Sequence, residues 1–143
     1  MARTVWTIGY EGHSPESLVA TLRDAGVRLL VDVRDLPLSR RPGFSKKALA
    51  EAVEGGGIAY SNIRALGAPK PIRAPYKAGE SFATFQARYR KHLAGQEAAL
   101  ADLIEQAKGT PTALLCYEAD PAACHRGIMG EELVARGFHV RHL

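Results

Sequence analysis

Short apolar runs alternate along the chain with longer segments in which apolar side chains recur at helical spacing. The apolar runs predict five strands, at residues 4–10, 29–33, 58–60, 112–116 and 138–143. The longer segments predict helices, at residues 14–26, 45–57, 82–108 and 121–136. Gly95 is expected to split or bend the third helix, since glycine weakens a helix interior.

The run LLVDV at residues 29–33 is almost continuously apolar, which is typical of a parallel strand buried on both faces. Strands that alternate with helices favour right-handed crossovers, and these put helices on both faces of a sheet. We therefore predict an α/β fold, a Rossmann-like three-layer sandwich with a mainly parallel sheet of about five strands. No repeat or linker interrupts the pattern, so residues 1–143 are predicted to form a single α/β domain. The order of the strands does not follow from the pattern.

Residues 63–81 break the alternation. They combine prolines and glycines with scattered basic residues, so we predict a long loop with little regular structure. Such loops are uncommon in small domains and are often functional. The part at residues 66–81 contains no recognisable motif, and the sequence assigns it no role.

The composition is that of an ordinary globular protein, with 46% hydrophobic and 24% charged residues. No apolar run approaches the roughly 20 residues that a membrane span needs, and the amino terminus lacks the pattern of a signal peptide. We therefore expect a cytoplasmic protein without membrane contact. Two cysteines are present, Cys116 and Cys124, and in that compartment we expect both to be reduced.

The formal net charge is +4 and the isoelectric point is about 9.3, which favours anionic partners through long-range attraction. The excess is modest and is not concentrated in a tail. A small phosphate-bearing ligand therefore fits better than nucleic acid, which usually requires a denser basic surface.

Reactive and charged side chains concentrate where predicted strands end, and in open α/β sheets ligands bind beyond the carboxyl ends of the strands. The candidates after the first two strands are Tyr10, Arg34, Ser39, Arg40 and Arg41. The candidates after the fourth strand are Cys116, Glu118, Cys124, His125 and Arg126. The strand starts carry no such groups, so we expect a site at the carboxyl edge of the sheet.

The segment after the fourth strand is the most informative. Asp120 is a suitable helix cap and Pro121 a suitable first helical residue. This start would place Cys124 and His125 in the first turns of the last helix. A helix amino terminus stabilises an anion and eases the ionisation of a cysteine thiol. Arg126 adds a group that can bind phosphate or carboxylate through two hydrogen bonds.

The pattern predicts two kinds of site residue. The catalytic candidates are Cys124, His125 and Glu118. The ligand-binding candidates are Arg34, Ser39, Arg40, Arg41, Arg126 and Tyr10. No particular cofactor is indicated.

Structural interpretations compete with these roles. Cys124 can be a buried core residue, since free cysteine is among the most buried residue types. Arg126 can pair with Glu118, and Arg34 with Asp32. Each residue alone is therefore ambiguous, and only the cluster favours a functional site.

A metal or redox site is a further alternative. Cys116, Cys124 and His125 could bind zinc, but their spacing matches no familiar zinc-ligand pattern, so we predict no metal site. A phosphatase-type or rhodanese-type loop would also place a cysteine after a strand and an arginine at a helix start. The nine residues between Cys116 and Arg126 make that loop too long for a tight anion cradle.

Three segments resemble a known family. They are TIGYEG at residues 7–12, DVR at residues 32–34 followed by Pro37, Ser39, Arg40 and Phe44, and the stretch from Cys116 to Arg126 that ends in Cys-His-Arg. In this order they resemble the domain-of-unknown-function 488 family, over residues 4 to about 136. The resemblance implies a Rossmann-like fold and a site at the shared polar positions Arg34, Ser39, Arg40, Cys116, Glu118, Cys124, His125 and Arg126.

The resemblance implies no activity, and three hypotheses remain. The favoured one is an enzyme or binding protein that acts on a small anionic ligand, phosphate-bearing or nucleotide-like. The second is a nucleic-acid-binding module without turnover, which would use the same basic residues. The third is a metal or redox site built on the two cysteines and His125.

Overall fold

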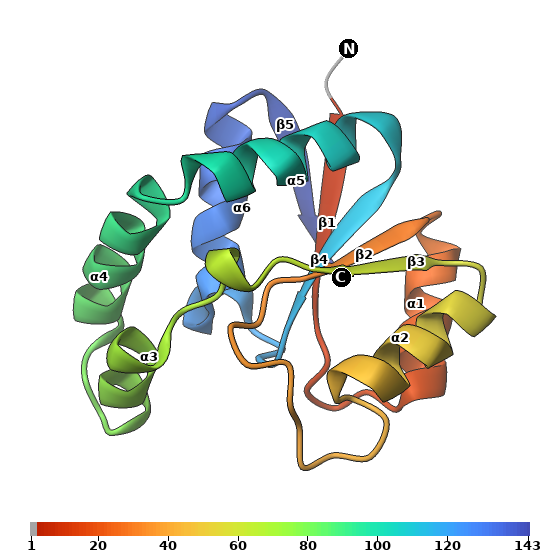
Figure 1. Ribbon diagram of the computed structural model, residues 1–143, viewed down its shortest axis with the longest axis horizontal. Helices are drawn as coiled ribbons and strands as arrows, with labels where there is room; N and C mark the ends of the chain where they lie inside the picture. Colours follow the sequence, from red (N-terminus) through yellow and green to blue (C-terminus); the bar gives the residue numbers. More distant parts are fainter. Residues whose placement is uncertain (1–2) are drawn as a thin grey trace.

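The computed structural model describes residues 3–143 and shows an α/β fold around a five-stranded, all-parallel sheet (Figure 1). The strands are β1 (Arg3–Gly9), β2 (Leu29–Asp32), β3 (Ala59–Asn62), β4 (Thr112–Cys116) and β5 (Phe138–His142). Their order is β3-β2-β4-β1-β5, so β4 lies between β2 and β1. The fold class that the alternation predicted is confirmed.

Helices cover both faces of the sheet. They are α1 (Pro15–Asp24), α2 (Lys46–Gly55), α3 (Lys70–Lys77), α4 (Phe82–Ala94), α5 (Glu97–Gly109) and α6 (His125–Ala135). The helices α1 and α2 pack on one face, and α4, α5 and α6 pack on the other (Figure 1). In β2, Leu30 contacts the first group and Val31 the second, because successive side chains of a strand point to opposite faces.

Within residues 3–143, no helix combines the length and the apolar character that crossing a membrane requires. The cytoplasmic location stays a prediction.

Two helix predictions have different outcomes. The long helix divides at Gly95 into α4 and α5, as expected. The last helix begins later than predicted, because Asp120 caps a separate 3-10 turn, η2 (Pro121–Ala123). Cys124 follows in an extended conformation as the N-cap residue, and α6 starts at His125. The prediction of one helix from residue 121 was wrong, since the Asp-Pro start signal serves the short turn.

The segment predicted as a long loop is largely helical, and that prediction was wrong. It contains the 3-10 turn η1 (Arg64–Leu66) and the helix α3. Pro71 stands in the first turn of α3, where its missing N–H would have no helical partner in any case. Ile72 and Tyr76 pack against the apolar core that includes α4 and α6. Tertiary packing therefore stabilises a helix that the local sequence disfavours.

Tyr89 of α4 anchors this segment. Its buried hydroxyl group donates to the carbonyl oxygen of Leu66 at 2.5 Å. The substitution Tyr89→Phe would leave that carbonyl unpaired, so we expect the free energy of unfolding to fall by about 1–3 kcal/mol. The midpoint of urea unfolding measures this loss, with Tyr117→Phe, an exposed position, as the control. Equal midpoints for the two variants would contradict the anchoring role.

Candidate functional site

A pocket of about 510 Å³ opens at the carboxyl ends of β1, β2 and β4. These strands are neighbours, so the segments that follow them meet at one edge of the sheet. Seven of the nine predicted site residues line the pocket: Tyr10, Arg34, Ser39, Arg40, Glu118, Cys124 and His125. Arg41 and Arg126 do not line it. A second cavity of about 520 Å³, next to α4, α6 and β5, contains none of the nine.

Arg34 forms part of the pocket wall and is held there by Asp32. Its Nε donates to Oδ1 of Asp32 at 2.8 Å, and its Nη2 donates to Oδ2 at 2.6 Å. Its Nη1 donates to the carbonyl oxygen of Phe44 at 2.7 Å. The Tyr60 hydroxyl group donates to the same carboxylate, and burial together with this bond raises the pKa of Tyr60. The predicted pairing of Arg34 with Asp32 is thus present, and it leaves 7% of Arg34 exposed.

Arg41 lies outside the pocket and fixes the loop between β2 and α2. Its Nη1 donates to the carbonyl oxygen of Tyr10 at 2.7 Å, and its Nη2 donates to that of His13. Ser39 belongs to the same loop, where its N–H donates to Oγ of Ser45 at 3.0 Å and its hydroxyl oxygen accepts from the Arg41 N–H. These contacts give the loop a defined shape beside the pocket.

Arg126 is completely buried next to the pocket rather than in its wall. Its Nη1 donates to Oγ1 of Thr7 at 2.8 Å, and its Nη2 donates to the carbonyl oxygens of Glu118 and Ala119 at 2.6 and 3.0 Å. Gly9 permits this close packing, because a Cβ atom there would lie 1.7 Å from the Glu118 carbonyl oxygen. The protein itself therefore occupies both Nη groups that were predicted to bind a ligand.

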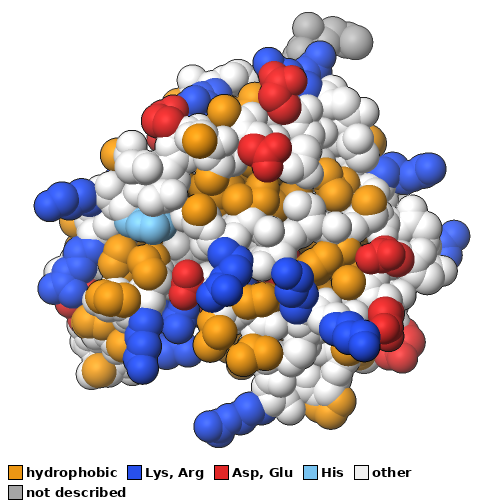
Figure 2. Space-filling view, in the orientation of Figure 1, with side chains coloured by type: hydrophobic (Ala, Val, Ile, Leu, Met, Phe, Trp, Pro, Cys, Tyr) orange, Lys and Arg blue, Asp and Glu red, His pale blue; other side chains and the backbone are white. Residues whose placement is uncertain are grey.

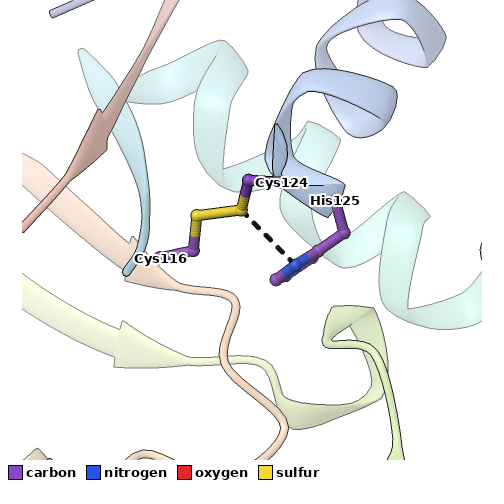
Figure 3. Close-up of side chains that lie close together, drawn as sticks. All are labelled: Cys116, Cys124 and His125. Atoms are coloured by element: carbon purple, nitrogen blue, oxygen red, sulfur yellow. Dashed lines mark hydrogen bonds between the residues drawn. A yellow bond between two sulfur atoms is a disulfide. The ribbon is translucent and has the colours of Figure 1, made fainter. Parts of the chain in front are cut away.

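Cys116, Cys124 and His125 meet at one side of the pocket (Figure 3). The two sulfur atoms are joined in a disulfide, and Nδ1 of His125 lies 3.6 Å from Sγ of Cys124. The sequence predicted two separate thiols, and the structure differs because the end of β4 and the start of α6 converge. That convergence is not visible in a spacing of eight residues. The reduced state of the cysteines in the cell stays a prediction.

His125 is held in one tautomer. Its Nε2 lies 2.7 Å from the carbonyl oxygen of Val33, which can only accept, so Nε2 carries the ring proton. Burial lowers the pKa of His125 to about 4, so the ring is neutral at pH 7. The unprotonated Nδ1 therefore directs its lone pair toward the sulfur of Cys124. Such an imidazole can accept a proton or bind a metal ion.

Glu118 lies at the edge of this group, with Oε2 3.8 Å from Sγ of Cys116. Burial raises the pKa of its carboxyl group, while a backbone hydrogen bond and the charges of Lys77 and Arg126 oppose the increase. A carboxyl group with a raised pKa in a pocket is suited to proton transfer.

Part of the pocket rim comes from α3, which the sequence did not single out. Arg73 and Lys77 of α3 line the pocket together with Arg40. Figure 2 shows Lys and Arg side chains among apolar ones in the region of α3 and the loop after β2. Arg73 pairs with Asp35 at 3.6 Å. Within the described part of the chain, Arg40 and Lys77 form no ion pair. The scattered basic residues at 66–81 were the sequence signal for this rim, but only the fold of α3 brings them to the site.

A family model described as domain of unknown function DUF488 matches residues 14–133. The match includes every residue that lines the pocket except Tyr10. Neither the curated proteins nor the solved structures include a match to the chain.

Proposed function

This chain belongs to the DUF488 family, whose description gives no activity, and from the site itself we propose that the pocket binds a small anionic ligand, phosphate-bearing or nucleotide-like. The observation that carries the proposal is the pair Arg40 and Lys77. Both side chains border one pocket, and both lack an ionic partner in the described part of the chain. Unpaired cations at a concave surface attract anions and bind them through charge-assisted hydrogen bonds.

The size and lining of the pocket support a small ligand. Its volume of about 510 Å³ lies within the range of small-molecule sites. Aromatic side chains, Tyr10, Tyr76 and Phe85, border the same space and suit a ligand with a planar or apolar part. A double-stranded nucleic acid would instead require a broad basic surface. The concave shape of this site therefore favours a small ligand over a duplex.

Glu118 is the group that we propose to exchange a proton with the bound ligand. It lines the pocket, and burial raises the pKa of its carboxyl group. The catalytic roles of Cys124 and His125 stay predictions.

Thermal unfolding in the presence of phosphate, sulfate or adenosine monophosphate tests the proposal at constant ionic strength. We expect each effective anion to raise the melting temperature, because a ligand at 100 times its dissociation constant stabilises the folded state by about 2.7 kcal/mol. The variants Arg40→Ala and Lys77→Ala should each weaken binding about tenfold or more, since a hydrogen bond to a charged group contributes about 1.5–3 kcal/mol.

Arg23→Ala is the matched control, since Arg23 is an exposed arginine in the last turn of α1 and does not line this pocket. The proposal fails if the three variants and the wild type respond equally to every anion. A steep decrease of the affinity for nucleic acid as the salt concentration rises, as expected when many phosphates are neutralised, would instead favour nucleic-acid binding.

A further inference from the structure

We propose that Cys116, Cys124 and His125 bind a zinc ion at the side of the pocket, with a fourth coordination position open to the ligand space. Their three potential ligand atoms lie within 4.8 Å of one another. Two thiolates and one imidazole are donors that zinc accepts in tetrahedral sites. This inference does not depend on anion binding, because the donor atoms belong to the chain itself.

The backbone positions of the two cysteines favour a shared ion over a direct bond. Their Cα atoms are 7.5 Å apart, whereas disulfides usually hold these atoms within about 7 Å. Cys116 is fixed at the end of β4 by pairing with Gly9 of β1, and Cys124 is fixed as the N-cap residue of α6. A zinc ion at about 2.3 Å from each sulfur spans a wider gap than a direct sulfur–sulfur bond does.

The orientation of His125 matches that of a metal ligand. Histidines that bind metals usually donate their other ring N–H to a carboxylate or a backbone carbonyl group, which fixes the tautomer. Here Nε2 makes that bond with Val33, at 2.7 Å, and Nδ1 is left on the side of the sulfurs. Figure 3 shows the imidazole ring beside the two sulfur atoms, at the start of α6. The hydrogen bond that would orient a zinc-binding imidazole is therefore already present.

Within residues 3–143, the protein supplies three ligands and leaves one position free. The carboxylate of Glu118 approaches Cys116 but lies outside the group of three ligand atoms. Zinc with three protein ligands and one open position is the arrangement of catalytic zinc sites, in which the fourth ligand is water or substrate. The anion that we propose for the pocket would then bind the zinc ion directly as its fourth ligand. This part of the inference rests on the proposed function.

Zinc binding and the disulfide exclude each other. Two thiols that bind Zn²⁺ each lose a proton, and no electrons are transferred. Formation of the disulfide removes two electrons and two protons, which an external oxidant must accept. The same two sulfurs cannot serve as thiolate ligands once they are bonded, so the experiment must begin with fully reduced protein.

The test uses the full chain, reduced and stripped of metal with a chelator, in a buffer without phosphate or sulfate. One equivalent of zinc should bind per chain, measured by elemental analysis after gel filtration. Cobalt in place of zinc should give the visible bands of tetrahedral coordination and a near-ultraviolet thiolate-to-cobalt band. The variants Cys116→Ser, Cys124→Ser and His125→Gln should each weaken zinc binding by more than about 100-fold, because each removes an atom that binds the ion directly rather than a group that only orients a ligand.

His139→Gln is the matched control, since His139 is an exposed histidine on β5 and should leave zinc binding unchanged. The inference is overturned if the reduced wild type binds less than about a tenth of an equivalent of zinc, or if cobalt gives no thiolate band. The cobalt spectrum of the wild type tests the zinc site even where a variant fails to fold. If the zinc-loaded protein binds no anion, that result counts against the proposed function alone, because zinc is measured here without any anion.

Discussion

Asp32→Asn should lower the free energy of unfolding by about 3–5 kcal/mol, because it leaves the guanidinium group of Arg34 buried without its counter-charge. Asp32 is completely buried, and its carboxylate accepts two hydrogen bonds from the Arg34 side chain and one from the Tyr60 hydroxyl group. The amide keeps one acceptor oxygen but loses the charge. Because Arg34 also holds the carbonyl group of Phe44, we expect the loop beside the pocket to loosen as well.

Urea unfolding measures this effect, and a double variant separates the charge from the packing. Asp32→Leu combined with Arg34→Met removes both charges, so it should be less destabilised than Asp32→Asn alone. A loss below about 1 kcal/mol for Asp32→Asn, or a larger loss for the double variant, would show that the buried pair does not govern stability here.

Arg126→Met should lower the free energy of unfolding by about 3 kcal/mol or more. The side chain is fully buried and ties three elements together: Thr7 on β1, the loop after β4 through Glu118 and Ala119, and α6, to which it belongs. Each hydrogen bond to a charged group contributes about 1.5–3 kcal/mol, and two carbonyl groups would lose their guanidinium partner.

Arg126→Lys should recover little of this loss, because an ammonium group cannot reproduce the planar set of donors that spans the three acceptors. The control is Arg136→Met, which removes exposed ion pairs with Glu132 and Glu97 and should change stability by less than about 1 kcal/mol. If Arg126→Met unfolds at the same urea concentration as Arg136→Met, Arg126 has no structural role of this size. Its predicted role as a ligand-binding residue would then regain support.

The fold class was predictable because a strand that is buried on both faces appears in the sequence as a continuous apolar run. In β2 and β4 the apolar runs are nearly continuous, and every residue of both strands is buried. Local helix signals were reliable where one residue decides the geometry. Ser14 caps α1 through its side chain as predicted, and Gly95 separates α4 from α5. The helix α3 was missed because its stability comes from Ile72 and Tyr76 packing on other elements.

The residues of the site were largely predictable, but their roles were not. The sequence identified Tyr10, Arg34 and Cys124 by their positions after strands, and all three line the pocket. It gave the same weight to Arg40 and Arg126, two arginines with opposite environments. Arg40 is exposed at the pocket, whereas Arg126 is buried and bonded to carbonyl groups of its own chain. Both residues are arginines that follow a predicted strand, so the sequence does not distinguish them. Only their burial in the folded protein does.

The sequence by itself determined which strands exist, that both faces of the sheet are covered, and which strand ends carry reactive groups, because these features depend on neighbours along the chain. Tertiary structure alone decided the strand order and therefore which ends meet. With β4 between β2 and β1, the carbonyl group of Val33 reaches His125, a residue 92 positions away, and the rim from α3 borders the same pocket. Such contacts arise from the packing of whole elements, and no local pattern encodes them.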